Sequence, residues 1–195
     1  MTSLLKTIKF GVTVPQSTKH ALQLDEENKD NLWKEAMKAE IDSLQEHGTF
    51  KVLEDETQIS DGYKWIPYHC IYDVKFDGRR KCRLVAGGHM TAPATEDVYS
   101  GVVNMETVRI VFVIAQLNGL LVVAGDVGNA FLYGITRECV YIKAGPEFGP
   151  ELCGKILIIY KALYGLKSSS GRSHEHLSAT LRYMGYKPTS ADYDL

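Results

Sequence analysis

The dipeptide Asp77-Gly78, which lies between two runs of strand-forming residues, constrains the fold more than any other feature. An Asp-Gly pair between such runs is a strong short-range signal for a β-hairpin, because tight turns need residues that tolerate positive φ. We therefore expect residues 64–76 to form a strand, Asp77-Gly78 to form the turn, and residues 79–86 to return antiparallel to the first strand.

Hydrophobic periodicity predicts helices on both sides of this hairpin. One helix is expected to start after residue 30 and to stop at His47-Gly48, and its apolar positions recur every three or four residues at Trp33, Met37, Ile41 and Leu44. Residues 107–117 read as a buried helix. The other expected elements are strands at 49–53, 120–124, 140–143 and 155–160, a short helix from about Ala130, and a helix with Leu177, Leu181 and Met184 that ends at Gly185. Helices alternating with antiparallel strands predict an α+β fold.

Composition excludes several classes of protein. The 22 basic residues against 24 acidic ones give a net charge of −2, so any nucleic-acid site must rest on local basic clusters. Four cysteines without C-x-x-C spacing indicate neither a zinc site nor a disulfide framework, and favour a reducing compartment. With no signal peptide or transmembrane segment recognised, we expect an intracellular protein, cytoplasmic or nuclear, without a membrane partner. Residues 1–30 are interpreted as an N-terminal flank or linker.

A lone carboxylate, Asp126, follows the apolar run at 120–124, and Gly125 and Gly128 next to it would let the backbone approach a ligand closely. Asp126 is either a turn or capping residue or one ligand of a metal site. The local pattern alone favours the turn residue, because aspartate is common in turns.

Two charged segments also have alternative readings. Arg79, Lys81 and Arg83 share one face of the predicted strand, where they could bind phosphate or simply protect a solvated hairpin edge. The segment 174–176 contains two histidines two positions apart, which point to different faces of a helix. We interpret it as a polar helix face, because the spacing is not that of H-E-x-x-H.

A series of spaced blocks resembles the reverse transcriptase domain of Ty1/copia-type retrotransposons over residues 31–195. Each block is weak alone, whereas the set, in this order and spacing, is specific. The blocks are residues 33–37 with Glu40 and Leu44, 48–50, 64–66, 77–78, 81–86, 124–134, 140–141, 145–148 and 161–169.

This resemblance implies the fingers and a partial palm of a right-hand polymerase, acting as an RNA-directed DNA polymerase on an RNA template, a DNA primer and dNTPs. It implies that Asp126 is catalytic and binds Mg²⁺ or Mn²⁺ in a two-metal nucleotidyl transfer. The implied nucleotide-binding residues are Lys81, Arg83, Val127, Gly128, Asn129 and Phe131, with the Phe131 ring excluding a 2′-hydroxyl. Tyr164, Gly165 and Lys167 are implied as support on the template side.

The chain departs from the family pattern in several places. Ser168 stands where glutamine is frequent, Ser170-Gly171 replaces Pro-Arg, and Gly128-Asn129 stands where a basic residue and threonine are common. The second metal motif, with its paired aspartates, is not recognised. We therefore expect a domain truncated before that motif, without the remaining palm, the thumb and the ribonuclease H part, and no catalysis by this chain alone.

Two alternatives remain open. The chain could be a non-catalytic, decayed remnant that acts at most as a nucleic-acid-binding module. It could also be an unrelated α+β enzyme, although the two glycines near Asp126 lack the G-x-G-x-x-G dinucleotide pattern. Truncation of a palm sheet further predicts exposed apolar faces, above all in the strands at 140–143 and 155–160.

Overall fold

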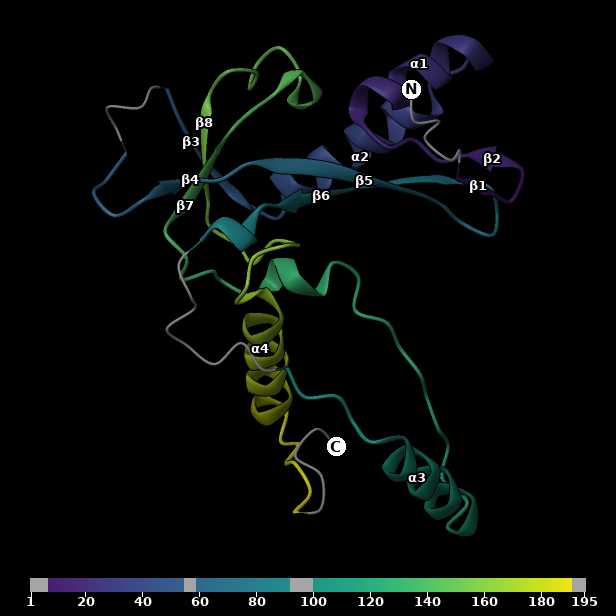
Figure 1. The fold of residues 1–195 in the computed structure, drawn as a ribbon. Helices are drawn as coiled ribbons and strands as arrows, with labels where there is room; N and C mark the ends of the chain where they lie inside the picture. Colours follow the sequence, from purple (N-terminus) through teal and green to yellow (C-terminus); the bar gives the residue numbers. More distant parts are fainter. Residues whose placement is uncertain (1–6, 55–58, 92–99, 191–195) are drawn as a thin grey trace.

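Helices and mostly antiparallel strands alternate along the chain, which confirms a mixed α and β fold (Figure 1). The computed structural model describes residues 7–54, 59–91 and 100–190. Its elements are β1 (Ile8–Lys9), β2 (Val12–Thr13), α1 (Thr18–Asn28), α2 (Leu32–Glu46), β3 (Phe50–Leu53), β4 (Lys64–Trp65), β5 (Tyr68–Val74), β6 (Arg80–Ala86), η2 (Gly88–Met90), α3 (Met105–Leu117), η3 (Ala130–Tyr133), β7 (Val140–Lys143), η4 (Pro146–Phe148), β8 (Ile156–Ile159) and α4 (Ser169–Tyr183).

The hairpin predicted around Asp77-Gly78 is formed by β5 and β6, with Val74 opposite Arg80. Its loop has three residues, 76–78, because the Lys75 N–H donates to the Arg79 carbonyl at 2.9 Å. Gly78 supplies the positive φ of +82° that this loop requires. The single strand predicted over 64–76 is wrong, since the chain breaks at Pro67, which has no N–H to donate.

This break assigns β4 and β5 to different sheets. β4 joins a four-stranded sheet in the order β3-β8-β7-β4, where it pairs parallel with β7, while the other pairs are antiparallel. One face of that sheet forms the main core with α2 and the end of β6. The buried core residues are Ile41, Leu44, Ile66, Leu84, Ala86, Leu132, Val140, Ile142, Ala144, Phe148, Leu157, Ile159, Leu163 and Leu166.

Residues 7–30 contribute to the packing of the rest of the protein. Ala21 and Leu24 of α1 lie in a second core cluster with Trp33 and Met37 of α2. The carboxylate of Asp25, itself buried, accepts hydrogen bonds from two N–H groups of the first turn of α2, those of Trp33 at 3.0 Å and Lys34 at 2.9 Å. The segment interpreted as a flank or linker therefore contains a helix that caps and covers α2.

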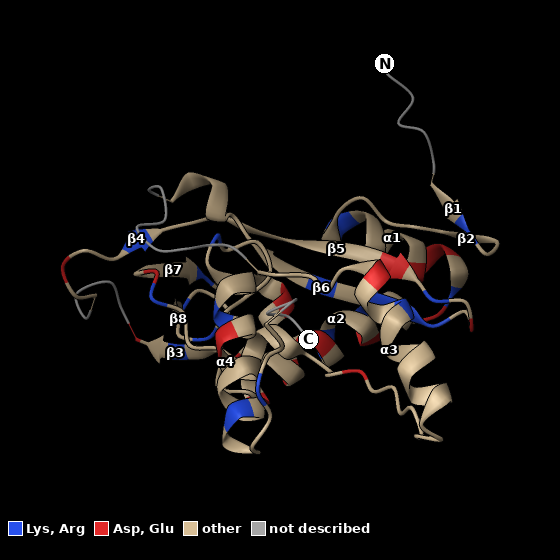
Figure 2. Ribbon diagram, turned by 90° about the horizontal axis from the view of Figure 1, so that it is seen from below, with Lys and Arg blue, Asp and Glu red and all other residues tan. Residues whose placement is uncertain are grey.

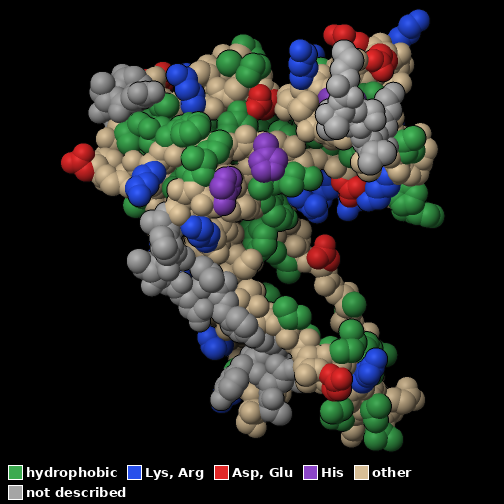
Figure 3. Space-filling view, viewed as in Figure 1, with side chains coloured by type: hydrophobic (Ala, Val, Ile, Leu, Met, Phe, Trp, Pro, Cys, Tyr) green, Lys and Arg blue, Asp and Glu red, His purple; other side chains and the backbone are tan. Residues whose placement is uncertain are grey.

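The helix predicted at 107–117 is present as α3, but its predicted burial is wrong. Among its residues only Ala115 is buried, and it stands at the end of two extended segments, away from the sheets (Figures 1 and 3). The strand predicted at 120–124 is absent, and Leu121 and Val123 are 96% and 90% exposed. An apolar segment forms a stable strand only when a neighbouring strand satisfies its backbone groups, and no described strand pairs with this one.

The expected exposure of the strands at 140–143 and 155–160 is also wrong. β8 lies between β3 and β7, and its four residues are at most 8% exposed. Among the described residues, α3 and residues 120–123 instead carry many of the exposed apolar side chains. Among the described residues, none of the helices has the length and hydropathy needed to cross a membrane.

Candidate functional site

Three residues from separate parts of the sequence meet below the hairpin. The Arg83 guanidinium carbon lies 5.5 Å from the centroid of the Tyr164 ring. The Phe131 ring lies on the same tyrosine, with centroids 4.8 Å apart and planes inclined by 66°. A cation over an aromatic face and an edge-to-face ring pair are both attractive arrangements. We call Arg83, Tyr164 and Phe131 the Arg83 cluster.

The loop that carries Tyr164 is fixed by unusually close backbone packing on the end of β6. The Ala86 N–H donates to the Tyr164 carbonyl at 2.7 Å. Gly165 has a φ of +91°, and a Cβ at this position would stand 2.0 Å from the Ala86 carbonyl oxygen. Only glycine allows this approach. The Lys167 ammonium donates to the Thr91 carbonyl at 2.7 Å, so this lysine also contacts the segment after β6.

The segment that carries Phe131 is held from two sides. Asn129 has a φ of +52°, and its amide donates to the Ser43 hydroxyl of α2 at 3.1 Å. The Ser173 hydroxyl of α4 donates to the Ala130 carbonyl at 3.1 Å. Leu132 anchors η3 in the main core. Val127 and Gly128 precede these anchors and are exposed, and a Cβ on Gly128 would have no atom within 4 Å.

The four cations of β6 and its turn have different surroundings. Figure 2 marks basic residues in blue on the ribbon. Arg79 pairs with Asp77 at 2.6 Å, and Arg80 lies over the Trp33 ring on the opposite face of the strand. Lys81 and Arg83 share the face of β6 that carries the Arg83 cluster. Partial burial, followed by repulsion from Arg83, lowers the pKa of the Lys81 ammonium.

Glu40 of α2 lies beside these cations and was not predicted as a site residue. Its carboxylate accepts a hydrogen bond from the Leu84 N–H at 3.1 Å, which satisfies a backbone donor of β6. Burial raises the pKa of Glu40, and the Leu84 hydrogen bond and the charges of Lys81 and Arg83 offset part of that rise. The feature that could have indicated Glu40 in the sequence is its position directly before Ile41, in the buried apolar stripe of α2.

A second group of contacts that the sequence did not predict joins η3, the end of α2 and α4. The Tyr133 ring of η3 packs edge-on against His47 at 5.9 Å and stacks on His176 of α4 at 5.8 Å. Arg172 pairs with Glu175 at 2.8 Å. His176 therefore contacts an aromatic ring, and among described residues the structure contains no group of three His, Cys, Asp or Glu side chains suited to a metal ion.

Asp126 is not brought into the Arg83 cluster by any contact in the described part of the chain. It lies in the extended segment between α3 and η3, is exposed, and within the described residues makes no hydrogen bond or ion pair. The structure thus brings together three residues implied by the family resemblance. They are Arg83 for the nucleotide, Phe131 for the sugar and Tyr164 for the template side. The predicted metal ligand stands apart from them.

Comparison with known proteins gives the family. A profile described as reverse transcriptase (RNA-dependent DNA polymerase) matches residues 49–195. The chain is also similar to the retrovirus-related Pol polyprotein from transposon TNT 1-94 of Nicotiana tabacum, with 31% identity over 188 residues. That match covers 91% of this chain but only 14% of the relative's length. No solved structure matches significantly. The chain belongs to the reverse transcriptase (RNA-dependent DNA polymerase) family and is of the copia type.

Proposed function

We propose that this chain supplies the fingers and the first part of the palm of an RNA-directed DNA polymerase. In this proposal it binds a dNTP together with an RNA template and a DNA primer, and it works with other parts of a Pol polyprotein. The observation that carries the proposal is the Arg83 cluster, in which Arg83 and Phe131, two residues with separate implied roles, both contact Tyr164.

Lys81 and Arg83 are proposed to bind the triphosphate. A guanidinium presents a planar fork of donors that matches phosphate oxygens, and the contact with Tyr164 holds the Arg83 fork in one orientation. Lys81 adds a compact charge on the same face of the strand. Glu40 sits next to both and limits the positive charge of this surface while it is ionised.

Phe131 is proposed to select deoxyribose. Its ring is fixed against Tyr164, so it cannot turn aside easily to admit a bulkier sugar. A ring placed under the sugar leaves no space for a 2′-hydroxyl, the group that distinguishes ribonucleotides from deoxyribonucleotides. Val127, Gly128 and Asn129 lie between Asp126 and this ring, and the lack of a side chain at Gly128 allows close approach of a ligand.

Divalent ions would activate the primer 3′-hydroxyl and stabilise the leaving pyrophosphate in this family. Mg²⁺ requires near-octahedral oxygen coordination, and Asp126 offers exposed carboxylate oxygens. However, no group of metal-binding side chains surrounds Asp126 among the described residues. The described residues therefore do not form a complete two-ion site, and the role proposed for Asp126 is that of one ligand.

Equilibrium binding of dTTP to the chain, in the presence of poly(rA) primed with oligo(dT), tests the proposal. Arg83→Ala should weaken dTTP binding about tenfold, equivalent to about 1.4 kcal/mol. Arg79→Ala is the matched control, because this arginine lies at the hairpin turn and forms a local ion pair with Asp77. Equal dTTP affinity for Arg83→Ala and the unchanged chain would show the proposal to be wrong.

A second candidate is a non-catalytic nucleic-acid-binding module, favoured by the absence of described contacts to Asp126. Primer extension with Mg²⁺, comparing the chain with Asp126→Asn, separates the two candidates. Extension that is lost on substitution supports polymerase function. Primer–template binding without extension by either protein supports the binding module.

A further inference from the structure

The four-stranded sheet has a second face, opposite to the main core, whose composition differs from that of a buried surface. Strand pairing places residues of all four strands in one row on this face and residues of three strands in the next. The first row is Lys51, Ile158, Tyr141 and Trp65, and the second row is Leu53, Ile156 and Lys143. We call these two rows the outer sheet face.

The outer sheet face is covered at one edge and open at the other. Leu53, Ile156 and Ile158 are buried, and Ile59 and Tyr63 pack against them. Trp65, in contrast, is 52% exposed, and Lys143 is exposed as well. Hydrophobic side chains with cations beside them gather over this part of the molecule in Figure 3. The open edge therefore presents an aromatic ring and an ammonium group.

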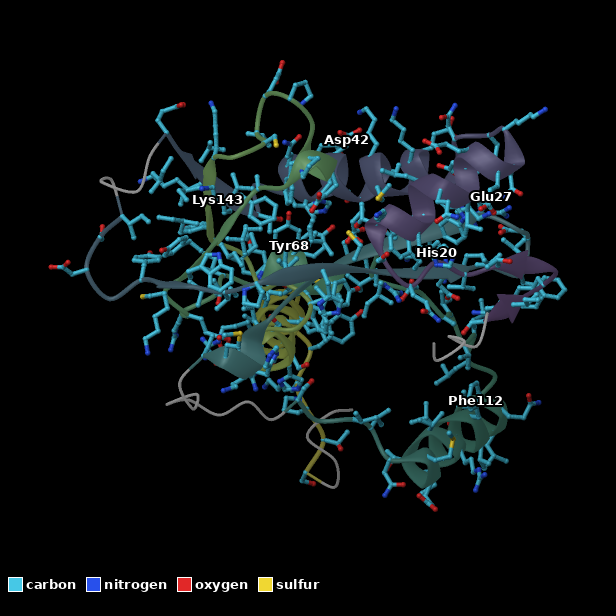
Figure 4. All side chains as sticks on the ribbon, turned by 45° about the horizontal axis from the view of Figure 1, so that its top comes forward. His20, Glu27, Asp42, Tyr68, Phe112 and Lys143 are labelled. Carbon is cyan, nitrogen blue, oxygen red and sulfur yellow. The ribbon has the colours of Figure 1, made fainter. Side chains whose placement is uncertain are left out.

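The open edge continues into a hollow of about 820 Å³. Trp65 and Lys143 line one side, Lys19 at the start of α1 lines another, and Tyr68 contributes from β5. Lys143 and Tyr68 are labelled in Figure 4. Trp65 therefore stands at the mouth of a space large enough to receive part of a polymer.

The charges around this hollow favour an anionic ligand. Two lysines line the hollow, Lys143 of the outer sheet face and Lys19 at the start of α1. The acid in the lining, Glu147, accepts a hydrogen bond from the Tyr68 hydroxyl, which also accepts one from the Gly145 N–H at 2.8 Å. Burial, followed by the bond to Glu147, raises the pKa of Tyr68, so the phenol stays a donor.

We propose that the outer sheet face binds single-stranded nucleic acid, with a base stacked on Trp65 and flanking phosphates on Lys143 and Lys19. Stacking on an exposed aromatic ring and contacts from nearby cations are the two elements of sequence-tolerant single-strand binding. A protein partner would be expected to cover apolar surface, but the aliphatic residues of this face are already covered.

This site is separate from the Arg83 cluster. Tyr68 and Arg83 belong to opposite faces of the hairpin, because Arg83 pairs with Ile71, an odd number of residues from Tyr68. The strand it would hold is an unpaired stretch of template, and this identification rests on the proposed function. The binding of single-stranded nucleic acid itself does not depend on polymerase activity.

Tryptophan fluorescence provides a direct test, because Trp33 is 1% exposed and Trp65 is the other tryptophan of the chain. Titration with a 12-nucleotide oligouridylate should quench the emission of Trp65. In an anisotropy assay with the same labelled oligonucleotide, Trp65→Ala should weaken binding about tenfold and Trp65→Phe should restore most of it. Lys143→Gln should reduce the slope of log affinity against log salt by about one.

Phe76→Ala is the matched control, because Phe76 is an exposed aromatic residue at the hairpin turn. It should leave oligouridylate affinity unchanged. Absence of oligouridylate binding, or equal affinity for Trp65→Ala and the unchanged chain, would overturn the inference. So would sedimentation data in which Trp65→Ala abolishes self-association and leaves oligonucleotide binding intact. Measuring dTTP affinity on the same samples separates this failure from failure of the proposed function, which depends on Arg83.

Discussion

Two short apolar runs in this chain have similar compositions and opposite surroundings. β8 has the sequence Ile-Leu-Ile-Ile, lies between two strands, and is at most 8% exposed. Residues 120–123 have the sequence Leu-Leu-Val-Val, and their exposed fractions range from 51% to 96%. An apolar run therefore indicates a segment that would be stabilised by burial. Whether neighbouring strands bury it depends on the rest of the fold.

The helices α2 and α3 show the same contrast. α2 has a polar face and an apolar stripe, and it buries that stripe against the hairpin and the main core. α3 is apolar around much of its circumference, a pattern typical of a helix surrounded by protein, yet it buries only Ala115. The Arg83 cluster is attached to the first region and Asp126 to the second. This explains why the cluster is fixed while Asp126 has no described partner.

The sharpest test of the contrast is a pair of leucine substitutions. Leu157→Ala removes a fully buried side chain from β8 and should lower the free energy of unfolding by about 3 kcal/mol. Leu121→Ala removes a 96% exposed side chain and should change it by less than about 0.5 kcal/mol. Urea unfolding followed by circular dichroism gives both values. Similar losses for the two variants would mean that residues 120–123 are packed in solution.

Two glycines allow the same comparison between a tightly packed and an open region to be made at the backbone. Gly165→Ala forces a Cβ toward the Ala86 carbonyl and should cost about 2 kcal/mol or more. Gly125→Ala should be neutral or slightly stabilising, because a Cβ there has no atom within 4 Å and its φ is not in the left-handed range. Thermal unfolding of both variants measures the difference. A Gly165→Ala protein as stable as the unchanged chain would contradict the close packing that positions Tyr164.

Local patterns predicted the elements whose partners are close in sequence. The stripe of Trp33 and Leu44 predicted α2, and Asp77-Gly78 predicted the hairpin. The parallel pairing of β4 with β7 could not be predicted, because it depends on a break at Pro67 and on a strand about 75 residues away. The blocks containing Arg83, Phe131 and Tyr164 were implied by family resemblance, but their contact arises from long-range packing that no local period encodes.

A substitution in the N-terminal segment should have an intermediate effect on the free energy of unfolding. Asp25→Ala removes both hydrogen bonds to the first turn of α2 and should lower the free energy of unfolding by about 1–2 kcal/mol. Asp30→Ala is the control, since Asp30 is only partly buried and bonds just one N–H, that of Leu32, at 3.3 Å. Chemical denaturation should rank the unchanged chain first, Asp30→Ala next and Asp25→Ala last. The reverse order would show that α1 does not cap α2.

The smallest expected effect concerns Glu40, and its sign depends on pH. Because burial raises the pKa of Glu40 in the folded state, its contribution to stability is fully present below the ordinary carboxyl value near 4.5. That contribution is lost as pH rises through the folded-state pKa. Glu40→Gln keeps an oxygen that can accept the Leu84 N–H but cannot ionise. Its stability relative to the unchanged chain should therefore increase with pH above about 4.5 and then level off.

Denaturant titrations of this variant at several pH values should be compared with those of Glu46→Gln, which removes an exposed carboxylate at the end of α2. A relative stability of Glu40→Gln that falls as pH rises would mean that attraction to Lys81 and Arg83 outweighs burial. In that case Glu40 would be held ionised by the two cations, and removing its charge would leave Lys81 and Arg83 repelling each other. The same measurement therefore decides whether α2 only supports β6 or also sets the charge of the proposed triphosphate surface.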